Sequence, residues 1–201
     1  MALVWMSGAE WGTIHEMDAW YNANTTTYRQ RTGSYSYDLA TYDWMKKYLP
    51  AMTEVFIQFA FYCNASGSVT FFALQKAGTN LVSIRKNSSN ILEVCQGWDG
   101  TVYCTGVTSL QINTWYVLEL HFRLDDTNGL IELRVDGNPE CSFAGDTKPG
   151  AEVDFDGAYW KAGVGFTINY DDIVVFDTTG TENNSWPGGL KVVLLKPNAD
   201  G

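Results

Sequence analysis

Residues 115–135, WYVLELHFRLDDTNGLIELRV, contain two runs in which apolar and polar side chains alternate. Because successive side chains of a strand point to opposite faces, this pattern predicts two antiparallel strands that bury one face. A loop at 126–129 keeps the apolar sets together and places Arg123 opposite Glu132, where opposite charges favour pairing. The apolar positions are Tyr116, Leu118, Leu120, Phe122, Leu124, Ile131, Leu133 and Val135.

Outward from this hairpin, short apolar runs separated by turn residues predict further strands, and helical periodicity is scarce. We expect the irregular, aromatic-rich residues 1–50 to pack on a sandwich of these strands, with Trp44 and Tyr48 on one face of a short helical turn. No linker or repeat divides the chain, which predicts one domain over residues 1–201. The predicted strands lie at 55–63, 69–74, 81–85, 91–105 (a hairpin), 141–144, 164–168, 172–176 and 190–195.

Composition limits the classes of partner. Hydrophobic residues make up 45% of the 201 and aromatic residues 14%, a balance that favours strands. The formal net charge of −10, with 13 basic residues, argues against a nucleic acid and against an anionic membrane surface. No stretch is long and apolar enough to span a bilayer, and residues 1–11 lack the pattern of a signal peptide, which predicts synthesis in a cytosol.

The cysteines do not follow the spacing of a zinc site. A two-residue turn at 99–100 would place Cys95 directly opposite Cys104, close enough for a disulfide. In a reducing cytosol two packed thiols are favoured over a bridge, although both arrangements fit the spacing. The cysteines are Cys63, Cys95, Cys104 and Cys141.

Several runs resemble known proteins. Residues 113–120 (NTWYVLEL) and 129–137 (GLIELRVDG) resemble the central hairpin of laminin-G-like and concanavalin-A-like jelly rolls. Residues 169–180 (NYDDIVVFDTTG) and the ending 196–201 (KPNADG) are similar to uncharacterised virion proteins of tailed bacteriophages. The resemblance implies an all-β fold, a concanavalin-A-like two-sheet antiparallel jelly-roll sandwich.

The resemblance also implies a function, although this fold hosts many. It implies a non-enzymatic structural protein that decorates the capsid or tail of a bacteriophage particle. Such a protein would be assembled into the virion in the host cytoplasm, in a symmetric assembly with other virion proteins. The alternative is a carbohydrate-binding adhesin module that recognises host-surface glycans, and a glycoside hydrolase is the third hypothesis.

Candidate ligand-binding residues come from tryptophans in or near the predicted loops. Trp98, Trp160 and Trp186 offer flat apolar faces for stacking on sugars, and Asp99 adds a polar partner beside Trp98. An exposed cluster of such side chains would indicate contact with a glycan or with another protein. Packing beneath the loops is the structural alternative for each of them.

Asp171 and Asp172 are the candidate metal ligands. On a strand their carboxylates would point to opposite faces, so one of them would enter the interior and need a hydrogen-bond partner. Structural bonds to loop amides are the favoured interpretation, and calcium is the alternative because it prefers oxygen ligands. No other cofactor is expected.

The sequence predicts no catalytic residues. Glucanases of this fold class carry three carboxylates on one strand, and Glu16 and Asp18 reproduce only part of that pattern. His15 and His121 are the only histidines, and neither has a nucleophile nearby in sequence.

Overall fold

The two alternating runs form β11 (Trp115–Arg123) and β12 (Gly129–Val135) in the computed structural model, which describes residues 2–179 and 186–193. Leu120 pairs with Leu133, and both are buried, as the alternation predicts. The predicted partner of Glu132 is wrong by two residues, because Glu132 lies opposite His121 rather than Arg123. The chain ends its pairing with β12 after Arg123, because the amide of Leu124 donates to the carbonyl of Thr53 and that of Asp125 to the hydroxyl of Thr147. A shift of two residues preserves the buried face.

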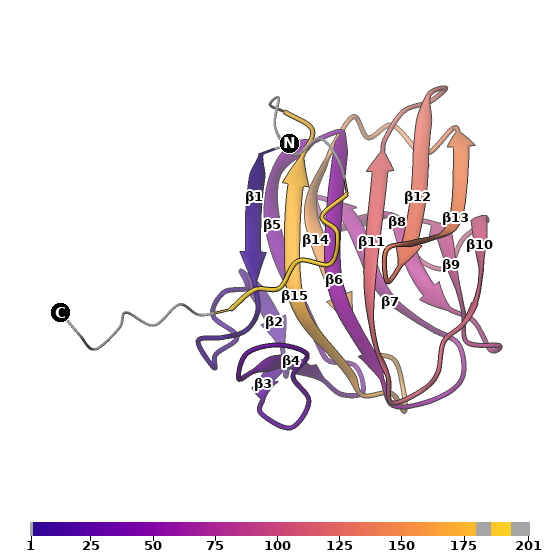
Figure 1. The fold of residues 1–201 in the computed structure, drawn as a ribbon. Helices are drawn as coiled ribbons and strands as arrows, with labels where there is room; N and C mark the ends of the chain where they lie inside the picture. The colour runs from indigo at the N-terminus through magenta and orange to yellow at the C-terminus, as the bar shows by residue number, and fades with distance from the viewer. Residues whose placement is uncertain (1, 180–185, 194–201) are drawn as a thin grey trace.

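One layer of the sandwich is an eight-stranded antiparallel sheet, which faces the viewer in Figure 1. Its strand order is β13-β12-β11-β6-β15-β4-β3, with β1 added on β15. β6 and β15 lie at its centre and are buried along nearly their whole length. The remaining bounds are β1 (Leu3–Ser7), β3 (Asn24–Thr26), β4 (Ser36–Leu39), β6 (Glu54–Cys63), β13 (Asn138–Gly145) and β15 (Ile168–Asp177).

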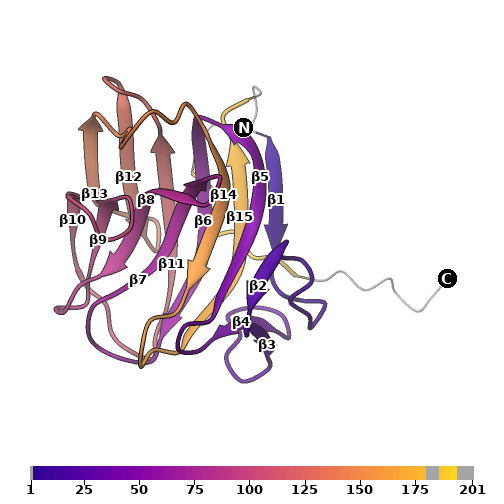
Figure 2. The ribbon, with the colours of Figure 1, turned by 180° about the vertical axis from the view of Figure 1, so that it is seen from behind.

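The other layer is a seven-stranded antiparallel sheet, which faces the viewer in Figure 2. Its strand order is β10-β9-β8-β7-β14-β5-β2, so β2 forms one edge next to β5. Strands far apart in the sequence are neighbours here, since β14 lies between β7 and β5. The bounds are β2 (Ala19–Tyr21), β5 (Trp44–Met52), β7 (Val69–Lys76), β8 (Thr79–Lys86), β9 (Ile91–Gln96), β10 (Val102–Ser109) and β14 (Phe155–Lys161).

This architecture confirms the predicted all-β, two-sheet jelly-roll sandwich, and it corrects several of the predicted elements. The helical turn expected at Trp44 and Tyr48 is wrong, because both residues lie in β5, where pairing with β14 satisfies the backbone. Residues 164–167 are a turn rather than a strand, and β14 was not predicted. The described part of the predicted strand 190–195 is not a strand, and residues 194–195 lie outside the described chain, as does the 196–201 motif.

The core lies between the sheets and is rich in aromatic rings. Phe59 of β6 packs against Phe72 of β7, with ring centroids 5.0 Å apart, and against Trp160 of β14 at 6.2 Å. The hydroxyl of Tyr170 donates to the carbonyl of Phe71 (2.9 Å), so this buried polar group has a partner. Among the described residues, no helix is long and apolar enough to cross a membrane.

A disulfide joins Cys104 of β10 to Cys141 of β13, with Cα atoms 5.8 Å apart. It links the edge strands of the two sheets at the same side of the sandwich. The predicted position of Cys104 opposite Cys95 is therefore wrong, and so is the favoured interpretation of two packed thiols, because Cys104 is bridged to Cys141. Cys95 lies opposite Val102, because the turn at 97–100 is longer than two residues, and its thiol is free and buried.

Residues 186–193, which we call the strap, cross the eight-stranded sheet in front of β6 and β15 (Figure 1). The buried side-chain amide of Gln58 both donates to and accepts from the backbone of the strap, as the backbone of a neighbouring strand does. Its Nε2 donates to the carbonyl of Leu190 (2.8 Å), and its Oε1 accepts from the amide of Leu190 (2.9 Å). The carboxylates of Glu119 and Asp172 accept from two further strap amides. Side chains of the sheet thus hold the strap in place.

Candidate functional site

The outer face of the seven-stranded sheet contains a cleft of about 460 Å³. The sheet that forms its floor faces the viewer in Figure 2, where β14 and β5 run side by side. The lining side chains come from β5, from β14, from the β7–β8 hairpin and from the turn between β9 and β10. They are Trp44, Lys46, Gln75, Gly78, Asn80, Trp98, Tyr159 and Lys161.

Strand alternation explains why four of these residues meet. In β5, Met45 is buried in the core, so its neighbours Trp44 and Lys46 face outward. In β14, Trp160 is likewise buried, so Tyr159 and Lys161 face outward. The register pairs Lys161 with Trp44 and Tyr159 with Lys46, and paired residues of antiparallel strands share a face. Two aromatic rings and two ammonium groups therefore form one patch.

Aromatic rings dominate the walls of the cleft. The ring of Tyr159 lies 5.8 Å from that of Trp44 and 5.8 Å from that of Trp98, measured between centroids. Such rings offer an apolar face and a polar edge, the combination that a sugar ring can contact. Burial raises the pKa of Tyr159 to about 12, so its hydroxyl is protonated at neutral pH.

The charge of the cleft is opposite to that of the whole chain. Lys46 and Lys161 line it, and none of its described lining residues carries a carboxylate, although the chain has a net charge of −10. Neither ammonium lies within ion-pair distance of a carboxylate in the described part of the chain. The nearby Asp156 instead contacts Lys76, at 3.3 Å. The cleft is therefore a local positive site on an acidic protein.

Gly157 makes room for one of these lysines. A Cβ atom at this position would lie 2.9 Å from Cε of Lys46, which is closer than real Cβ contacts. Lys46 therefore crosses β14 over a residue without a side chain, and its Nζ lies 4.9 Å from the ring centroid of Tyr48. The glycine is explained by this close approach.

Trp98 is held on a constrained turn. Gly97 and Asp99, on either side of it, have φ values of +60° and +61°, and the amide of Gly97 donates to the carbonyl of Leu81 (2.8 Å). Thr70 donates a hydrogen bond to the carboxylate of Asp99. Asp99, predicted to contact a ligand, thus anchors the turn and does not line the cleft, while Trp98 does. Nζ of Lys161 lies 5.5 Å from the centroid of the Trp98 ring.

The other two predicted tryptophans lie elsewhere. Trp160 has no exposed surface, because alternation along β14 points it into the core, so its predicted role in binding is wrong. Trp186 lies in the strap on the opposite sheet, where its ring packs on Phe56 at 5.5 Å and under the guanidinium of Arg134 at 3.9 Å. The predicted aromatic residues therefore do not form one site.

Asp171 and Asp172 are both buried, but their carboxylates do not point to opposite faces as predicted, since both contact Arg31 and Thr32. A bulge in β15 and a φ of +48° at Asp172 turn both carboxylates toward one loop. The carboxylate of Asp171 accepts from the amides of Arg31 and Thr32, and that of Asp172 pairs with the Arg31 guanidinium. Burial, and then the charge of Asp172, raise the pKa of Asp171 to about 7. No group of three or more potential metal ligands occurs in the described chain, and calcium stays an untested prediction.

The acidic and histidine candidates form no catalytic arrangement in the described residues. Glu16 contacts Ser7, whereas Asp18 pairs with Lys47 at 3.1 Å. His121 lies on the outer face of the other sheet, with its ring nitrogens 2.8 Å from Glu54 and 2.9 Å from Glu132. These carboxylates hold structural partners instead of facing one another across a cleft.

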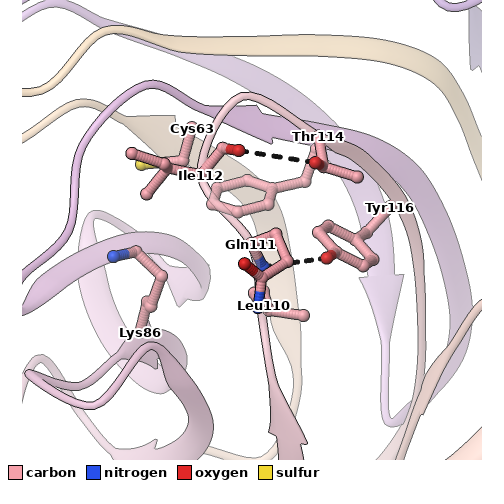
Figure 3. Close-up of a pocket in the computed structure, with 8 residues that line it drawn as sticks. Cys63, Lys86, Leu110, Gln111, Ile112, Thr114 and Tyr116 are labelled. Atoms are coloured by element: carbon pink, nitrogen blue, oxygen red, sulfur yellow. Dashed lines mark hydrogen bonds between the residues drawn. The ribbon is translucent and has the colours of Figure 1, made fainter.

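A narrow space between the sheets, near Cys63 and Lys86, is too small for a water molecule (Figure 3). The Lys86 ammonium donates to the carbonyls of Ala65 (3.0 Å) and Gly67 (2.9 Å) and to Oδ1 of Asn90 (2.6 Å). Burial lowers the pKa of this lysine. Because its hydrogen bonds are made within the protein, we interpret this space as structural.

Sequence reasoning missed Trp44, Lys46, Tyr159 and Lys161. The available signal was the alternation of polar and apolar residues about Met45 and about Trp160. It was missed because Trp44 and Tyr48 also fit helical spacing, and because β14 contains the small or polar residues 156–158 directly after Phe155.

No protein-family model matches the chain, and no curated protein matches it. Solved structures do share its fold. An endo-β-1,4-glucuronan lyase from the fungus Trichoderma reesei aligns with a TM-score of 0.63 and 11% identity over 87% of this chain and 95% of that one. The alginate lyase Aly36B aligns with a TM-score of 0.54 and 11% identity over 77% of this chain and 86% of that one. The carbohydrate recognition domain of Emp46p aligns with a TM-score of 0.51 and 10% identity over 78% of this chain and 87% of that one.

These likenesses show a lectin-like jelly-roll sandwich and bear on two expectations. The prediction that the chain is not an enzyme is contradicted, because polysaccharide lyases are prominent among the similar structures. The predicted role in a bacteriophage particle finds no support in them. The alternative prediction, a carbohydrate-binding protein, agrees better with what these structures are.

Proposed function

We propose that the chain binds an acidic polysaccharide in the cleft of the seven-stranded sheet. The observation that carries this proposal is the pair Lys46 and Lys161, unpaired in the described chain, beside aromatic rings and away from any lining carboxylate. A polymer of uronic acid carries one carboxylate per sugar and offers apolar ring faces between them, so it matches both features. Glucuronan and alginate, which name two of the similar lyases, belong to this class.

Polar side chains at the other end of the cleft complete the proposed site. Nε2 of Gln75 donates to Oδ1 of Asn80 (2.7 Å). This bond orients both amides and leaves the Gln75 carbonyl and the Asn80 amino group for a ligand. Sugar hydroxyls both donate and accept, so they can bond to both groups.

Calorimetric titration with alginate oligosaccharides tests this proposal, with neutral cello-oligosaccharides of the same length as the ligand control. Replacing both Lys46 and Lys161 by alanine should weaken binding about tenfold, since exposed ion pairs contribute about 0.2–1 kcal/mol each. Added salt should weaken wild-type binding. Lys148→Ala is the matched control, because this lysine pairs with Asp126 away from the cleft. Equal affinity for neutral and acidic chains, or no loss in the double variant, would overturn the proposal.

Cleavage by β-elimination is a second candidate, and the chemistry of the lining favours it over hydrolysis. Glycoside hydrolysis needs two carboxyl groups, and the described lining of the cleft has none. The cleft does hold Tyr159, which is paired with Lys46 on the neighbouring strand. As a phenolate, Tyr159 would take the C5 proton of a uronate, the C4–O4 bond would break as the C4–C5 double bond forms, and the resulting phenol would return the proton to O4.

The ultraviolet absorbance of the unsaturated product measures this reaction. Because the pKa of Tyr159 is raised to about 12, its phenolate is scarce at neutral pH, and the rate should increase about tenfold per pH unit below that value. Tyr159→Phe should abolish product formation and keep oligosaccharide binding. A rate that is independent of pH, or an active Tyr159→Phe variant, would rule out this role for Tyr159.

A further inference from the structure

The aromatic surface of the cleft continues onto a strand that does not line it. β2 pairs with β5 in the register Tyr21–Trp44 and Ala19–Lys46. Because paired residues share a face, Tyr21 and Ala19 lie on the same side of the sheet as the cleft. The Tyr21 side chain is 54% exposed, although it directly adjoins Trp44.

The register orders these residues into a row across the strands. Tyr21 of β2, Trp44 of β5 and Lys161 of β14 are successive partners. Neighbouring strands lie about 4.8 Å apart, so this row extends about 10 Å from the lysine to the edge of the sheet. Trp98 and Tyr159 continue the aromatic surface in the other direction. A polymer crossing the strands at this level would pass over Tyr21 after leaving Trp44.

β2 is a firm support for Tyr21, even though it is a short edge strand. The amide of Asp18 donates to the carbonyl of Lys46 (3.0 Å), and its carboxylate accepts from the amide of Tyr48 (2.7 Å). On the opposite face, the ring of Trp20 stacks on His15 at 5.5 Å. The start of β2 and the face opposite Tyr21 are thus fixed to their surroundings. Ala19, the small residue opposite Lys46, leaves the surface beside Tyr21 open.

We propose that Tyr21 forms an outer subsite that stacks on one additional sugar of an acidic polysaccharide, at the β2 edge of the sheet. This inference rests on the proposed function and adds a statement about the length of the ligand. Oligosaccharides long enough to extend from Trp98 past Trp44 contact Tyr21, and shorter ones that fill only the cleft do not. The protein therefore binds a long chain more tightly than a short fragment.

A series of alginate oligosaccharides of increasing length, titrated into wild type and Tyr21→Ala, tests the subsite. Tyr21→Ala should leave the affinity for the shortest binding oligosaccharide unchanged and weaken the longest about threefold to tenfold, the effect of one aromatic contact. Tyr21→Phe keeps the ring and should bind like wild type. Tyr28→Ala is the matched control, because Tyr28 is 93% exposed and lies outside the row.

The outcomes separate this inference from the proposed function. If Tyr21→Ala binds long oligosaccharides as wild type does, or weakens all lengths equally, the subsite is refuted while cleft binding stands. If wild type binds no acidic oligosaccharide of any length, the proposed function fails, and the subsite fails with it.

Discussion

Trp160→Ala should destabilise the protein strongly, because the structure places this residue in the core rather than in a binding site. Its side chain has no exposed surface. It packs on Trp5 and Phe59 from one sheet and on Phe72 from its own, with centroid distances of 6.4, 6.2 and 5.5 Å. Truncation would leave a cavity between the two sheets. The sheets cannot move together to fill it without breaking their other packing contacts.

The expected loss is about 3–5 kcal/mol, the usual cost of removing a buried tryptophan. For a chain of this size, that loss lowers the melting temperature by roughly 6–20 °C in differential scanning calorimetry. Trp160→Phe should cost less, since it retains a ring and removes an indole N–H that has no partner among the described residues.

Trp98→Ala is the contrasting variant, because Trp98 lines the open cleft. It should weaken oligosaccharide binding and shift the melting temperature by less than about 4 °C, as expected for a loss under 1 kcal/mol. A melting temperature of Trp160→Ala close to that of wild type would refute the reasoning. So would an equally large destabilisation by Trp98→Ala.

Two further predictions concern stability. The pKa of Asp171 is raised from 3.8 to about 7 in the folded protein. The stabilisation that goes with this raised pKa is therefore complete below about pH 4 and is lost as the pH rises to about 7. Urea titrations should therefore show the stability of wild type relative to Asp171→Asn falling over this interval, by at most about 1.4 kcal/mol per pH unit; a constant difference would contradict the raised pKa. The disulfide closes a loop with a sequence separation of 37, for which chain entropy gives about 4 kcal/mol. Reduction should lower the melting temperature of wild type but not that of Cys104→Ser, and equal behaviour of the two would show that the bridge does not form.

The predictable part of the fold is the part encoded locally. The alternation about Leu118 and Leu133 identified a hairpin and its buried face, and these survive in β11 and β12. The same pattern did not determine the register, because a shift of two residues leaves every side chain on its original face. The contacts that decide it, from the amides of residues 124 and 125, involve Thr53 and Thr147, which are remote in the sequence.

The candidate site was less predictable, because it depends on which strands become neighbours. Lys46 and Tyr159 meet only when β5 pairs with β14, and no local pattern indicates that pairing. Trp98 and Trp160 are equally plausible ligand contacts by residue type. The structure separates them, because alternation along β14 buries Trp160 in the core, whereas the turn between β9 and β10 places Trp98 in the cleft.

The strap gives the two broad sides of the molecule different chemistry. Gln58, Glu119 and Asp172 each form a hydrogen bond with the backbone of the strap, so on this side the sheet directs polar side chains to the protein itself. On the other side, the amides and ammonium groups of the cleft retain capacity for an outside molecule. Immobilising the protein through the strap side should therefore preserve oligosaccharide capture, whereas attachment through Lys46 or Lys161 should block it.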